Sequence, residues 1–403
     1  MSVISGKKIL LGITAGIAAY KTASLVRGLI KSGAQVKVVM TPAAKDFITP
    51  LTLSTLSKNP VHSSFYDDED DNAIWNNHVD LGLWADIMVI APATANTLSK
   101  MASGTSDNLL LATYLSAKCP VYFAPAMDLD MYNHPSTHKT FSTLQGYGNI
   151  MIPAESGELA SGLVGEGRMA EPDNIIDFIE QHILKTLPLK NKKILITAGP
   201  TYEAIDPVRF IGNHSSGKMG IELAKTAANL GAQVICVLGP SAITVTHKHI
   251  TVLPVTSAAE MFETVKTHYP SCDVVISAAA VADYRPKQVS DQKLKKKDGD
   301  LSIALERTTD ILRWLGDHKD KQYLVGFALE TENELANAQG KLKRKNLDLI
   351  VLNSLNDAGA GFKNETNKIT LIDHKQNIQT FELKSKTEVA KDIFEKIMSL
   401  LNL

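Results

Sequence analysis

Short apolar runs that end near a glycine recur along the chain, and helical patterns of apolar residues follow them. The run KKILLGITAG begins at Lys7, and KKILITAGPT begins at Lys192. Each run has the continuous apolar character of a parallel strand that is buried on both faces. The next apolar positions repeat at helical spacing, as at Leu25, Val26 and Leu29 in the first half. We therefore predict alternating strands and helices.

Each of these helices is predicted to end at a glycine that opens another strand. In the first half, Gly33 opens the strand pattern in SGAQVKVVMTP. In the second half, Gly231 opens the matching pattern in LGAQVICVLGP. Glycine suits the left-handed residue that closes a helix. Further on, ADIMVIAPATANT (85–97) resembles CDVVISAAAVADY (272–284). This succession predicts the α/β class, with two doubly wound, mainly parallel-sheet domains.

The predicted join between the domains lies near KTLPLKNKK, residues 185–193, where Pro and Lys interrupt the periodicity. We expect one domain over residues 1–189 and a second over residues 190–403. In open sheets of this kind, ligands bind at the carboxyl ends of the strands. The loops that follow the predicted strands are therefore the places to look for a site.

Composition narrows the possible functions. Hydrophobic residues make up 44% and charged residues 21% of the chain, which is ordinary for a globular protein. The net charge of -1 argues against a nucleic-acid partner bound through a basic surface. Three sparse cysteines form no disulfide framework and indicate the cytoplasm. No run reaches about 18 apolar residues, so we expect no membrane span.

Small residues and hydroxyl groups follow the predicted strands of the first half. In GITAGIAAYK (12–21), backbone N–H groups and the Thr14 hydroxyl are suited to hold a phosphate at a helix start. Small residues at such a turn also permit plain packing of helix on sheet. APATANT (91–97) offers a shallow wall for a flat ligand, with Thr94 and Asn96 as hydrogen-bonding groups. Together these loops favour a mononucleotide such as FMN.

A single histidine and an acidic run lie between these loops. A lone histidine such as His78, in WNNHVDLGLWAD, is most often structural. An imidazole near a flavin is also suited to acid–base chemistry near neutral pH. The run DDEDD (67–71) is most simply a solvated acidic loop.

The first half contains, in order, His78, APATAN, PAMDLDMY (125–132) and SGELASGLVGEGRMAEP (156–172). These motifs resemble those of the flavin-dependent cysteine decarboxylases, especially the phosphopantothenoylcysteine decarboxylases. The resemblance implies a flavodoxin-like domain in which FMN carries the redox step, while the protein supplies placement and proton transfer. It implies catalytic roles for His78, Asp128 and Ser161. The FMN contacts that it implies are Thr14, Gly16, Ile17, Thr41, Thr94 and Asn96.

The chain departs from these decarboxylases at two positions. Asp128 stands where the family carries Asn, and Ser161 stands where it carries the Cys that returns a proton to the product. A Ser hydroxyl is far less acidic than a thiol. We expect Asp128 to take part in that proton transfer beside the substrate carboxylate. Tyr132, Glu158 and water remain alternative proton donors.

In the second half, GNHSSGKMG (212–220) has the spacing of a P-loop but carries Met219 where a P-loop needs Ser or Thr. The first glycine of a P-loop follows its strand directly, whereas here the strand KILITAG ends about a dozen residues earlier. We therefore predict a different kind of loop. Ser215 and Ser216 would lie near a helix start that is still suited to phosphates.

The similarity between the matching segments of the two halves shows where the second half has additional residues. The offset between matching residues is 185 from Lys7 to Lys192 and 198 from Gly33 to Gly231. The 13 additional residues fall in the turn that contains GNHSSGKMG. We predict that this turn is an enlarged loop.

Lysines are concentrated later in the second half. AAAVADYRPKQVSDQKLKKKDGD (278–300) contains a run that is either a solvated segment or a flap over phosphates. The lysines of this run are Lys293, Lys295, Lys296 and Lys297. Lys341 and Lys345 are four residues apart, and we expect them on one helical face turned toward the same phosphates.

DPVRFIGNHSSGKMG, AAAVADYRP, KLKKK and RKNLDLIVLN occur in the order found in phosphopantothenate–cysteine ligases. With both halves in one chain, the sequence resembles the bacterial bifunctional decarboxylase/ligases of coenzyme A biosynthesis. The resemblance implies that Asn213 stabilises an acyl-cytidylate, that Lys293 contacts phosphates, and that the ligase domain is Rossmann-like. The CTP contacts that it implies are Ser277, Ala278, Ala279, Asp283, Thr309, Asp310, Ile311, Leu312, Phe327, Lys341 and Lys345.

The resemblance also implies the small-molecule partners: 4′-phosphopantothenate, cysteine and CTP, with Mg²⁺ beside the triphosphate. The sequence identifies no metal ligand and does not distinguish CTP from ATP. Decarboxylase trimers and ligase dimers are expected, so His78 would act on a flavin held by a neighbouring subunit.

The main alternative is an active ligase with an impaired decarboxylase half. A non-enzymatic binding subunit and an NAD(P) dehydrogenase are disfavoured, the latter because GxGxxG is missing.

Overall fold

The structure, a computed structural model, describes residues 2–66, 75–295, 301–354 and 364–403. The acidic run 67–71 and the lysines Lys296 and Lys297 lie outside the described residues. The chain divides into two compact units between Ile183 and Leu184, and each is described by itself. Among the described residues, no helix is both long and apolar enough to cross a membrane.

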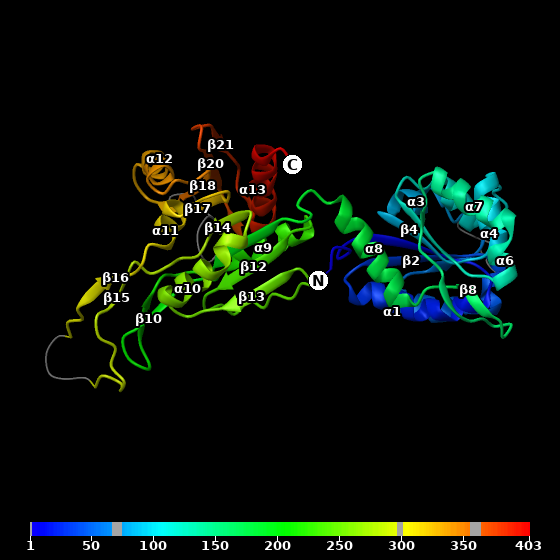
Figure 1. The fold of residues 1–403 in the computed structure, drawn as a ribbon, viewed down its shortest axis with the longest axis horizontal. Helices are drawn as coiled ribbons and strands as arrows, with labels where there is room; N and C mark the ends of the chain where they lie inside the picture. The colour runs from blue at the N-terminus through cyan, green and yellow to red at the C-terminus, as the bar shows by residue number, and fades with distance from the viewer. Residues whose placement is uncertain (1, 67–74, 296–300, 355–363) are drawn as a thin grey trace. The chain divides into compact units, whose positions relative to one another are not determined.

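The first unit is built on six parallel strands in the order β3-β2-β1-β4-β5-β6 (Figure 1). β1 pairs with β2 on one side and with β4 on the other, so the topological switch point lies between β1 and β4. These strands are β1 Lys8–Ile13, β2 Gln35–Met40, β3 Val61–His62, β4 Ile87–Ala93, β5 Val121–Pro125 and β6 Ile150–Met151.

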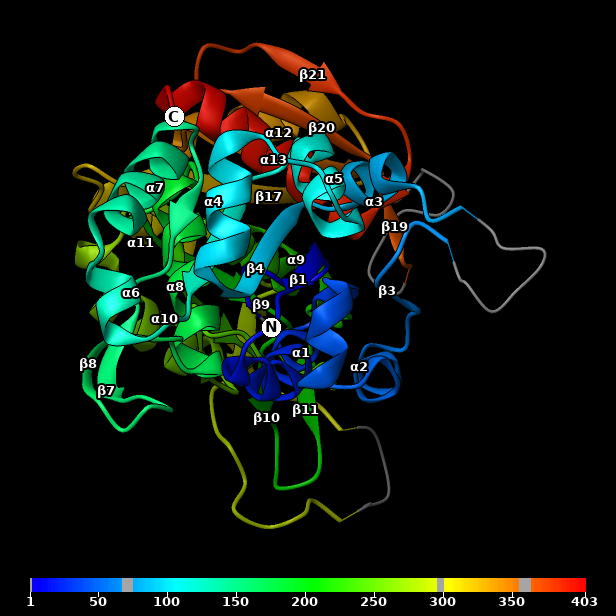
Figure 2. The ribbon, with the colours of Figure 1, turned by 90° about the vertical axis from the view of Figure 1, so that its right-hand side faces the viewer.

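Helices cover both faces of this sheet. Figure 2 shows α1 and α2 on one side of β1 and β4, with α4 and α5 on the other. A separate antiparallel hairpin, β7 Glu155–Glu158 with β8 Val164–Arg168, follows the sheet. The helices are α1 Thr22–Lys31, α2 Pro50–Ser57, α3 His78–Trp84, α4 Ala95–Ser103, α5 Leu109–Ser116, α6 Leu129–Asn133, α7 Pro135–Gly146 and α8 Pro172–Thr186, with 3-10 turns at Ile17–Lys21 and Pro42–Asp46.

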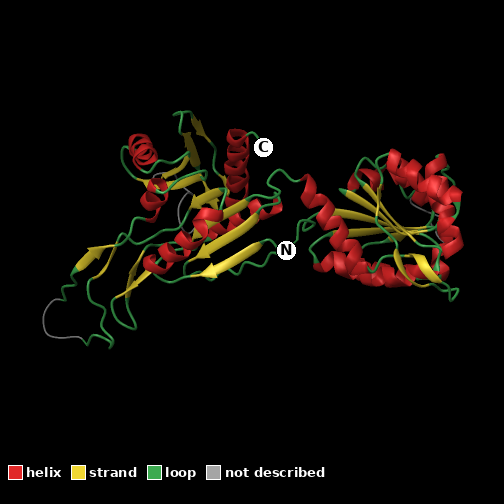
Figure 3. Cartoon of the chain, in the orientation of Figure 1, coloured by secondary structure: helices red, strands yellow, loops and turns green. Residues whose placement is uncertain are grey.

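The second unit contains an eight-stranded sheet in the order β13-β12-β9-β14-β17-β18-β20-β21, with helices on both faces (Figure 3). β13 to β18 of this order are parallel, and β20 and β21 add antiparallel strands at one edge. The predicted class, two doubly wound and mainly parallel sheets, is confirmed. The strands are β9 Lys193–Ala198, β12 Gln233–Leu238, β13 Ile250–Pro254, β14 Val274–Ser277, β17 Tyr323–Glu330, β18 Leu349–Ser354, β20 Ile369–Asp373 and β21 Ile378–Thr380.

Successive residues of β9 enter two different cores of the second unit. Ile194 and Ile196 belong to a cluster that includes residues of α9 and α13, whereas Leu195 belongs to a cluster that includes residues of α10 and α12. A strand buried on both faces in this way reads as a continuous apolar run, as predicted. The helices are α9 Lys218–Asn229, α10 Ala258–His268, α11 Ile311–Asp317, α12 Glu334–Arg344 and α13 Lys386–Leu401, with a 3-10 turn at Tyr269–Ser271.

The predicted enlarged loop after β9 is confirmed. It contains an antiparallel hairpin, β10 Tyr202–Ala204 with β11 Phe210–Gly212, between the strand and α9. α9 begins at Lys218, after Gly217 at its N-cap. A second small hairpin, β15 Tyr284–Pro286 with β16 Leu305–Arg307, follows β14, and β19 Thr366–Asn367 pairs with β22 Lys384–Ser385 near the C-terminus.

Glycines close the matching helices of the two units, as predicted. Gly33 follows α1 with φ +91°, and Gly231 follows α9 with φ +98°. An added Cβ at Gly33 would lie 2.5 Å from the Ser5 Oγ atom, and one at Gly231 would lie 2.9 Å from the Leu187 Cβ atom. Both the backbone conformation and the packing therefore require glycine.

We expect Gly33→Ala to lower the free energy of unfolding of the first unit by about 1–2 kcal/mol, because L-residues are strained in this region of φ. Gly146→Ala, in α7 of the same unit, is the matched control, since open space surrounds its Cβ position. It should change stability by less than about 0.5 kcal/mol. Urea unfolding of the full chain measures both variants, and equal losses would contradict the explanation.

Candidate functional site

The carboxyl edge of the first sheet holds a cavity of about 600 Å³, which we name the sheet-edge cavity. Of the residues predicted to contact FMN, Thr41, Thr94 and Asn96 line it. Lys100 and Asp107, which sequence reasoning missed, form an ion pair at its wall. The loops after β1, β2, β4 and β5 all contribute to this cavity.

A polar atom in the sheet-edge cavity lacks a partner. The Thr41 Oγ1 atom is buried and has no hydrogen-bond partner among the described residues. A buried hydroxyl without a partner costs free energy. A phosphate or polyol oxygen of a flavin nucleotide would satisfy it, so the residues present fit that group.

Thr14 lies in the predicted turn after β1, but its hydroxyl is already hydrogen-bonded within the protein. Its side chain is fully buried, its hydroxyl donates to the Pro92 carbonyl oxygen at 2.6 Å, and it accepts from the Thr94 N–H at 3.2 Å. Thr14 lines neither this cavity nor its neighbour. In the structure it joins the end of β1 to the loop after β4, which fixes the wall of the cavity.

A second cavity of about 490 Å³, the hairpin cavity, lies between the loop after β1 and the β7–β8 hairpin. Gly16 and Ile17, both predicted FMN contacts, line it together with Asp128 and Ser161. Ala126 and Met127 line both cavities, so the two adjoin. Glu158, an alternative proton donor, lines the hairpin cavity, whereas Tyr132 does not.

Lys21, which sequence reasoning missed, joins two segments that form walls of the hairpin cavity. Lys21 ends the motif GIAAYK, and its side chain is only 6% exposed. Its ammonium donates to the Met169 carbonyl oxygen at 3.1 Å and to the Glu171 carboxylate at 2.8 Å. Arg168, on β8, donates to the same Glu171 oxygen at 2.7 Å. The hydrogen bond from Lys21 lowers the pKa of Glu171, and Arg168 adds to this effect.

His78 lies apart from both cavities. It is the first residue of α3 and packs edge-on against Phe65. It lines neither cavity, and its buried Nδ1 atom has no hydrogen-bond partner within the described part of the chain. The structure therefore does not bring His78 together with Asp128 and Ser161 within one unit.

Two adjoining cavities lie at the carboxyl edge of the second sheet. The Asp310 cavity has a volume of about 490 Å³, and the Asn213 cavity has about 640 Å³. They share a common wall, formed by Ala279, Val281, Asp283, Phe327 and Lys341. The predicted residues Ser277, Thr309, Asp310, Ile311, Leu312 and Lys345 line the former, and Ala278 and Asn213 line the latter.

Two lysines give the Asp310 cavity positive charge. Lys345 donates to both Asp310 carboxylate oxygens, at 2.9 and 2.8 Å, and Lys341 donates to the Phe327 carbonyl oxygen at 2.7 Å. Burial lowers the pKa of Lys341, and the neighbouring Lys345 lowers it further. Burial alone would raise the pKa of Asp310, but the hydrogen bond from Lys345 brings it below its usual value. Of the two lysines, Lys341 is thus the one without a carboxylate partner at hydrogen-bond distance among the described residues.

Ser277 supplies an unsatisfied polar group at the same edge. Its Oγ atom is buried and has no partner among the described residues, and it lines the Asp310 cavity at the end of β14. Among the same residues there is no cluster of three or more His, Cys, Asp or Glu side chains that would hold a metal ion. The Ser277 hydroxyl and the neighbouring lysines suit an anionic, hydrogen-bonding ligand.

The Asn213 cavity is built by the enlarged loop. The Asn213 amide donates to the Val281 carbonyl oxygen at 2.9 Å, which ties this loop to the loop after β14. The cavity walls include the start of α9 at Gly217 and Lys218, and Lys218 forms an ion pair with Glu365. Asn353 and Asn367, from strands near the C-terminus, were missed because only the fold brings them here.

Lys293 lines neither cavity of the second unit. Thr197, Tyr284, Arg307 and Thr308 were also missed by sequence reasoning, although they line the Asp310 cavity. Thr197 lies near the end of the predicted strand KILITAG, and this position could have identified it as a candidate for the site.

Family models match both units. The model described as Flavoprotein matches residues 2–184, and that described as DNA/pantothenate metabolism flavoprotein C-terminal domain matches residues 189–401. The coenzyme A biosynthesis bifunctional protein CoaBC of Bacillus subtilis (strain 168) is 43% identical over 399 residues, covering 98% of each chain. A crystallised C-terminal domain of a CoaBC protein is 46% identical and covers 53% of this chain and 98% of its own, with a TM-score of 0.46.

A further relative has a different name. A cysteine/cysteine sulfinic acid decarboxylase from an unknown prokaryotic organism is 56% identical over 360 residues, covering 88% of this chain and all of its own. Fold, cavities and family models define the class: a two-domain α/β flavoprotein of pantothenate metabolism. The chain belongs to the family of bifunctional coenzyme A biosynthesis enzymes.

We expect Lys21→Met to lower the free energy of unfolding by about 1–2 kcal/mol, since it removes a buried cation that Glu171 and a carbonyl oxygen both use. The loss is partial because Arg168 still pairs with Glu171, which is half exposed. Lys100→Met breaks a more exposed ion pair of the same unit and should cost at most about 1 kcal/mol. Urea unfolding distinguishes the two, and a smaller loss for Lys21→Met than for Lys100→Met would contradict this account.

Proposed function

We propose that the second unit joins 4′-phosphopantothenate to cysteine at the expense of CTP. The carboxylate attacks the α-phosphate of CTP, forming an acyl-cytidylate and releasing pyrophosphate. The cysteine amine then attacks the acyl carbon, forming the amide and releasing CMP. Activation is needed because a free carboxylate is a poor acyl donor. Mg²⁺ and Lys341 would offset the negative charge of the triphosphate.

The continuity of the Asp310 and Asn213 cavities supports this proposal most directly. The nucleotide would occupy the Asp310 cavity, and the acyl substrate would occupy the Asn213 cavity. The shared wall at Ala279, Asp283 and Lys341 lies where the reacting groups must meet. Asn213 is hydrogen-bonded to Val281 of this shared wall, so it is suited to hold the acyl-cytidylate during attack by the amine.

The first unit would decarboxylate the product, phosphopantothenoylcysteine, to 4′-phosphopantetheine. FMN, when bound in the sheet-edge cavity, supplies reversible hydride acceptance, which makes loss of CO₂ possible. The chain's own part is to position the substrate in the adjoining hairpin cavity and to return a proton to the product. Asp128, Ser161 and Glu158 line that cavity and are the candidates for the proton transfer.

We propose that the chain works as a homo-oligomer in a reducing compartment, the cytoplasm. His78 lines neither cavity of its own unit, so it would act on a flavin held by a second copy. Val79 and Leu83, on the same helix, are 42% and 57% exposed and are suited to such an interface. All three cysteines are free, and two of them are buried, which fits a compartment without disulfide formation.

A coupled assay tests both half-reactions. The purified chain is given phosphopantothenate, cysteine and CTP, with and without FMN, and products are followed by mass. CTP-dependent pyrophosphate release together with phosphopantothenoylcysteine supports the ligase. Loss of CO₂ only with FMN supports the decarboxylase. A ligase product that is never decarboxylated would instead support the alternative of an impaired first half.

The lowered pKa of Lys341 predicts a pH dependence of CTP binding. The ammonium carries its charge below its pKa, so its attraction for the triphosphate is complete at low pH and declines as pH rises through that pKa. CTP affinity should therefore weaken on the alkaline side earlier than an ordinary lysine would allow. Titration calorimetry across pH measures this effect. Lys341→Met should weaken CTP binding about tenfold near neutral pH, and the fall in CTP affinity at alkaline pH should disappear. If that fall remains in the variant, Lys341 is not the group that causes it.

A second candidate substrate for the first unit is free cysteine or a related β-sulfur amino acid. The 56% identical relative carries a name of that kind. Free cysteine has a charged ammonium group where phosphopantothenoylcysteine has a neutral amide. Asp128 and Glu158 place two carboxylates in the hairpin cavity, and either is suited to pair with that ammonium.

Asp128→Asn distinguishes the roles of this residue. If Asp128 binds an ammonium, kcat/KM for free cysteine should fall about tenfold while decarboxylation of phosphopantothenoylcysteine is sustained. If Asp128 serves proton transfer, kcat should fall for both substrates. Carbon dioxide release from each substrate is the measurement, and unchanged rates for both would exclude Asp128 from either role.

A further inference from the structure

The start of α13 is held in place by contacts with two other elements of the second unit. The Thr387 hydroxyl donates to the Glu222 carboxylate on α9 at 2.8 Å. Ser385 caps the helix, and Glu388 completes a capping box with it. Just before the helix, β22 pairs with β19. The apolar face of α13 lies in the core cluster that it shares with α9. The first residue of the helix, Lys386, therefore has a fixed position.

Lys386 is a buried lysine at the wall of the Asn213 cavity. The residue is only 4% exposed, and it lines this cavity. Burial lowers its pKa, and the neighbouring Lys218 lowers it further, while Glu365 opposes the change. Glu365 is itself 80% exposed and forms an ion pair with Lys218. A buried ammonium beside a second cation is favourable where an anion binds between or against them.

The side chains that line the Asn213 cavity carry more positive than negative charge. Lys218, Lys341 and Lys386 line it, and Asp283 is the one acidic residue among the lining residues that the structure describes. Asp283 and Lys341 belong to the wall that is shared with the Asp310 cavity, whereas Lys386 lines the Asn213 cavity alone. Lys386 therefore adds positive charge outside the shared wall.

Two amide side chains accompany Lys386 in the same cavity. Asn367, on β19, is 3% exposed and lines the cavity together with Asn353. In the β19–β22 pair, Asn367 lies opposite Lys384, two residues before Lys386. The Asn367 amide nitrogen donates to the Asn353 Oδ1 atom at 3.3 Å. A buried ammonium and neutral amide groups on one wall suit the oxygen atoms of a phosphate.

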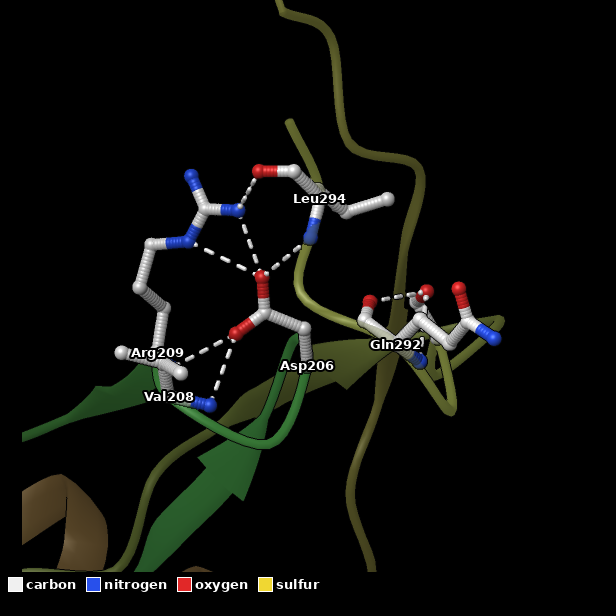
Figure 4. A network of polar contacts seen from close by, with 6 residues as sticks. Asp206, Val208, Arg209, Gln292 and Leu294 are labelled. Atoms are coloured by element: carbon white, nitrogen blue, oxygen red, sulfur yellow. Dashed lines mark hydrogen bonds and ion pairs between the residues drawn. The ribbon is translucent and has the colours of Figure 1, made fainter. Parts of the chain in front are cut away.

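A buried charge elsewhere in the second unit shows a different arrangement. The Asp206 side chain is 0% exposed, and its Oδ2 atom accepts from the Arg209 guanidinium and from the Leu294 N–H (Figure 4). Arg209 also donates to the Leu294 carbonyl oxygen at 2.8 Å. Asp206 and Arg209 thus join two loops and line none of the four cavities. Lys386, in contrast, contributes its charge to a cavity wall.

We propose that Lys386 binds the phosphate group of 4′-phosphopantothenate and so selects the phosphorylated substrate over pantothenate. This inference rests on the ligase function proposed above. The substrate carries a carboxylate at one end, which must meet the nucleotide at the shared wall, and a phosphate at the other end. Lys386 lies outside the shared wall and is suited to the phosphate. It acts through binding alone and takes no part in the bonds that form and break.

Steady-state kinetics of the full-length enzyme test the proposal. Lys386→Met keeps an unbranched side chain and removes the charge. With CTP and cysteine saturating, we expect it to raise the KM for 4′-phosphopantothenate by about ten- to one-hundredfold. The kcat should change less than about threefold, because a contact remote from the reacting carboxylate holds substrate and transition state alike. The KM for CTP should stay within about twofold, since Lys386 does not line the Asp310 cavity.

A control and a second variant accompany Lys386→Met. Lys384→Met removes a lysine of the same segment that pairs with Asp392 and lines neither cavity of the second unit, so it should leave each KM within about twofold. Lys386→Gln keeps a hydrogen-bond donor without the charge, and its KM for 4′-phosphopantothenate should lie between those of Lys386→Met and the unsubstituted chain. Circular dichroism and the midpoint of thermal unfolding confirm that each variant is folded.

A competition between substrates tests the specificity directly. Each enzyme receives 4′-phosphopantothenate together with a large excess of pantothenate, and the two cysteine adducts are measured by mass. The preference for the phosphorylated substrate should fall at least about tenfold in Lys386→Met and stay unchanged in Lys384→Met.

The outcomes separate the inference from the function on which it rests. If the unsubstituted chain releases no pyrophosphate from CTP, the proposed ligase function fails. If it does, but the KM for 4′-phosphopantothenate is unchanged in both Lys386 variants, the inference is overturned. A higher KM without a lower preference for the phosphorylated substrate means that Lys386 contacts another part of it, which also overturns the inference. Equal increases in the KM values for 4′-phosphopantothenate and CTP would indicate general damage to the unit and have the same consequence.

Discussion

The burial of each parallel sheet on both faces decides where polar chemistry can lie in this protein. Successive side chains of β9 enter separate apolar cores, so neither face of the strand has room for a ligand. The first positions at which polar groups can gather are the ends of the strands. Because parallel strands all end at one edge, the loops that follow them meet there. All four cavities described above are lined by such loops, and those of the second unit are also lined by residues at the ends of strands, such as Phe327 and Asn353.

Much of this arrangement follows from the sequence, because a buried strand and a helix closed by glycine have local signatures. The apolar runs at Lys7 and Lys192, the closing residues Gly33 and Gly231, and the loop enlarged by 13 residues could all be predicted. Thr41, which directly follows β2, and Ser277, the last residue of β14, lie at the carboxyl edge of their sheets, as expected for the same reason. The local sequence pattern is sufficient to predict the structure where residues close in the sequence determine it.

The remaining site residues depend on contacts between distant segments. Lys21 was missed because its partners Met169 and Glu171 are far along the chain, and nothing in GIAAYK shows that its ammonium is buried. Asn367 reaches the Asn213 cavity only through the strand pairing near the C-terminus. The Thr14 hydroxyl is in the predicted place but is already bonded to the loop after β4. Motif spacing gives the position of a side chain along the sequence, but it does not show which hydrogen-bond partners that side chain has in the folded protein.

One insertion distinguishes the turn after the first strand in the two units. Both have a strand, a turn and a helix at the corresponding place, but the second unit adds 13 residues there. Those residues contribute to the β10–β11 hairpin, whose tip carries Asp206 and Arg209, and the enlarged turn also carries Asn213. A single enlarged turn therefore walls the Asn213 cavity and holds the backbone beside Lys293. A shared scaffold can acquire the machinery for a different reaction in this way, because the buried strands stay unchanged while the loop after one of them grows.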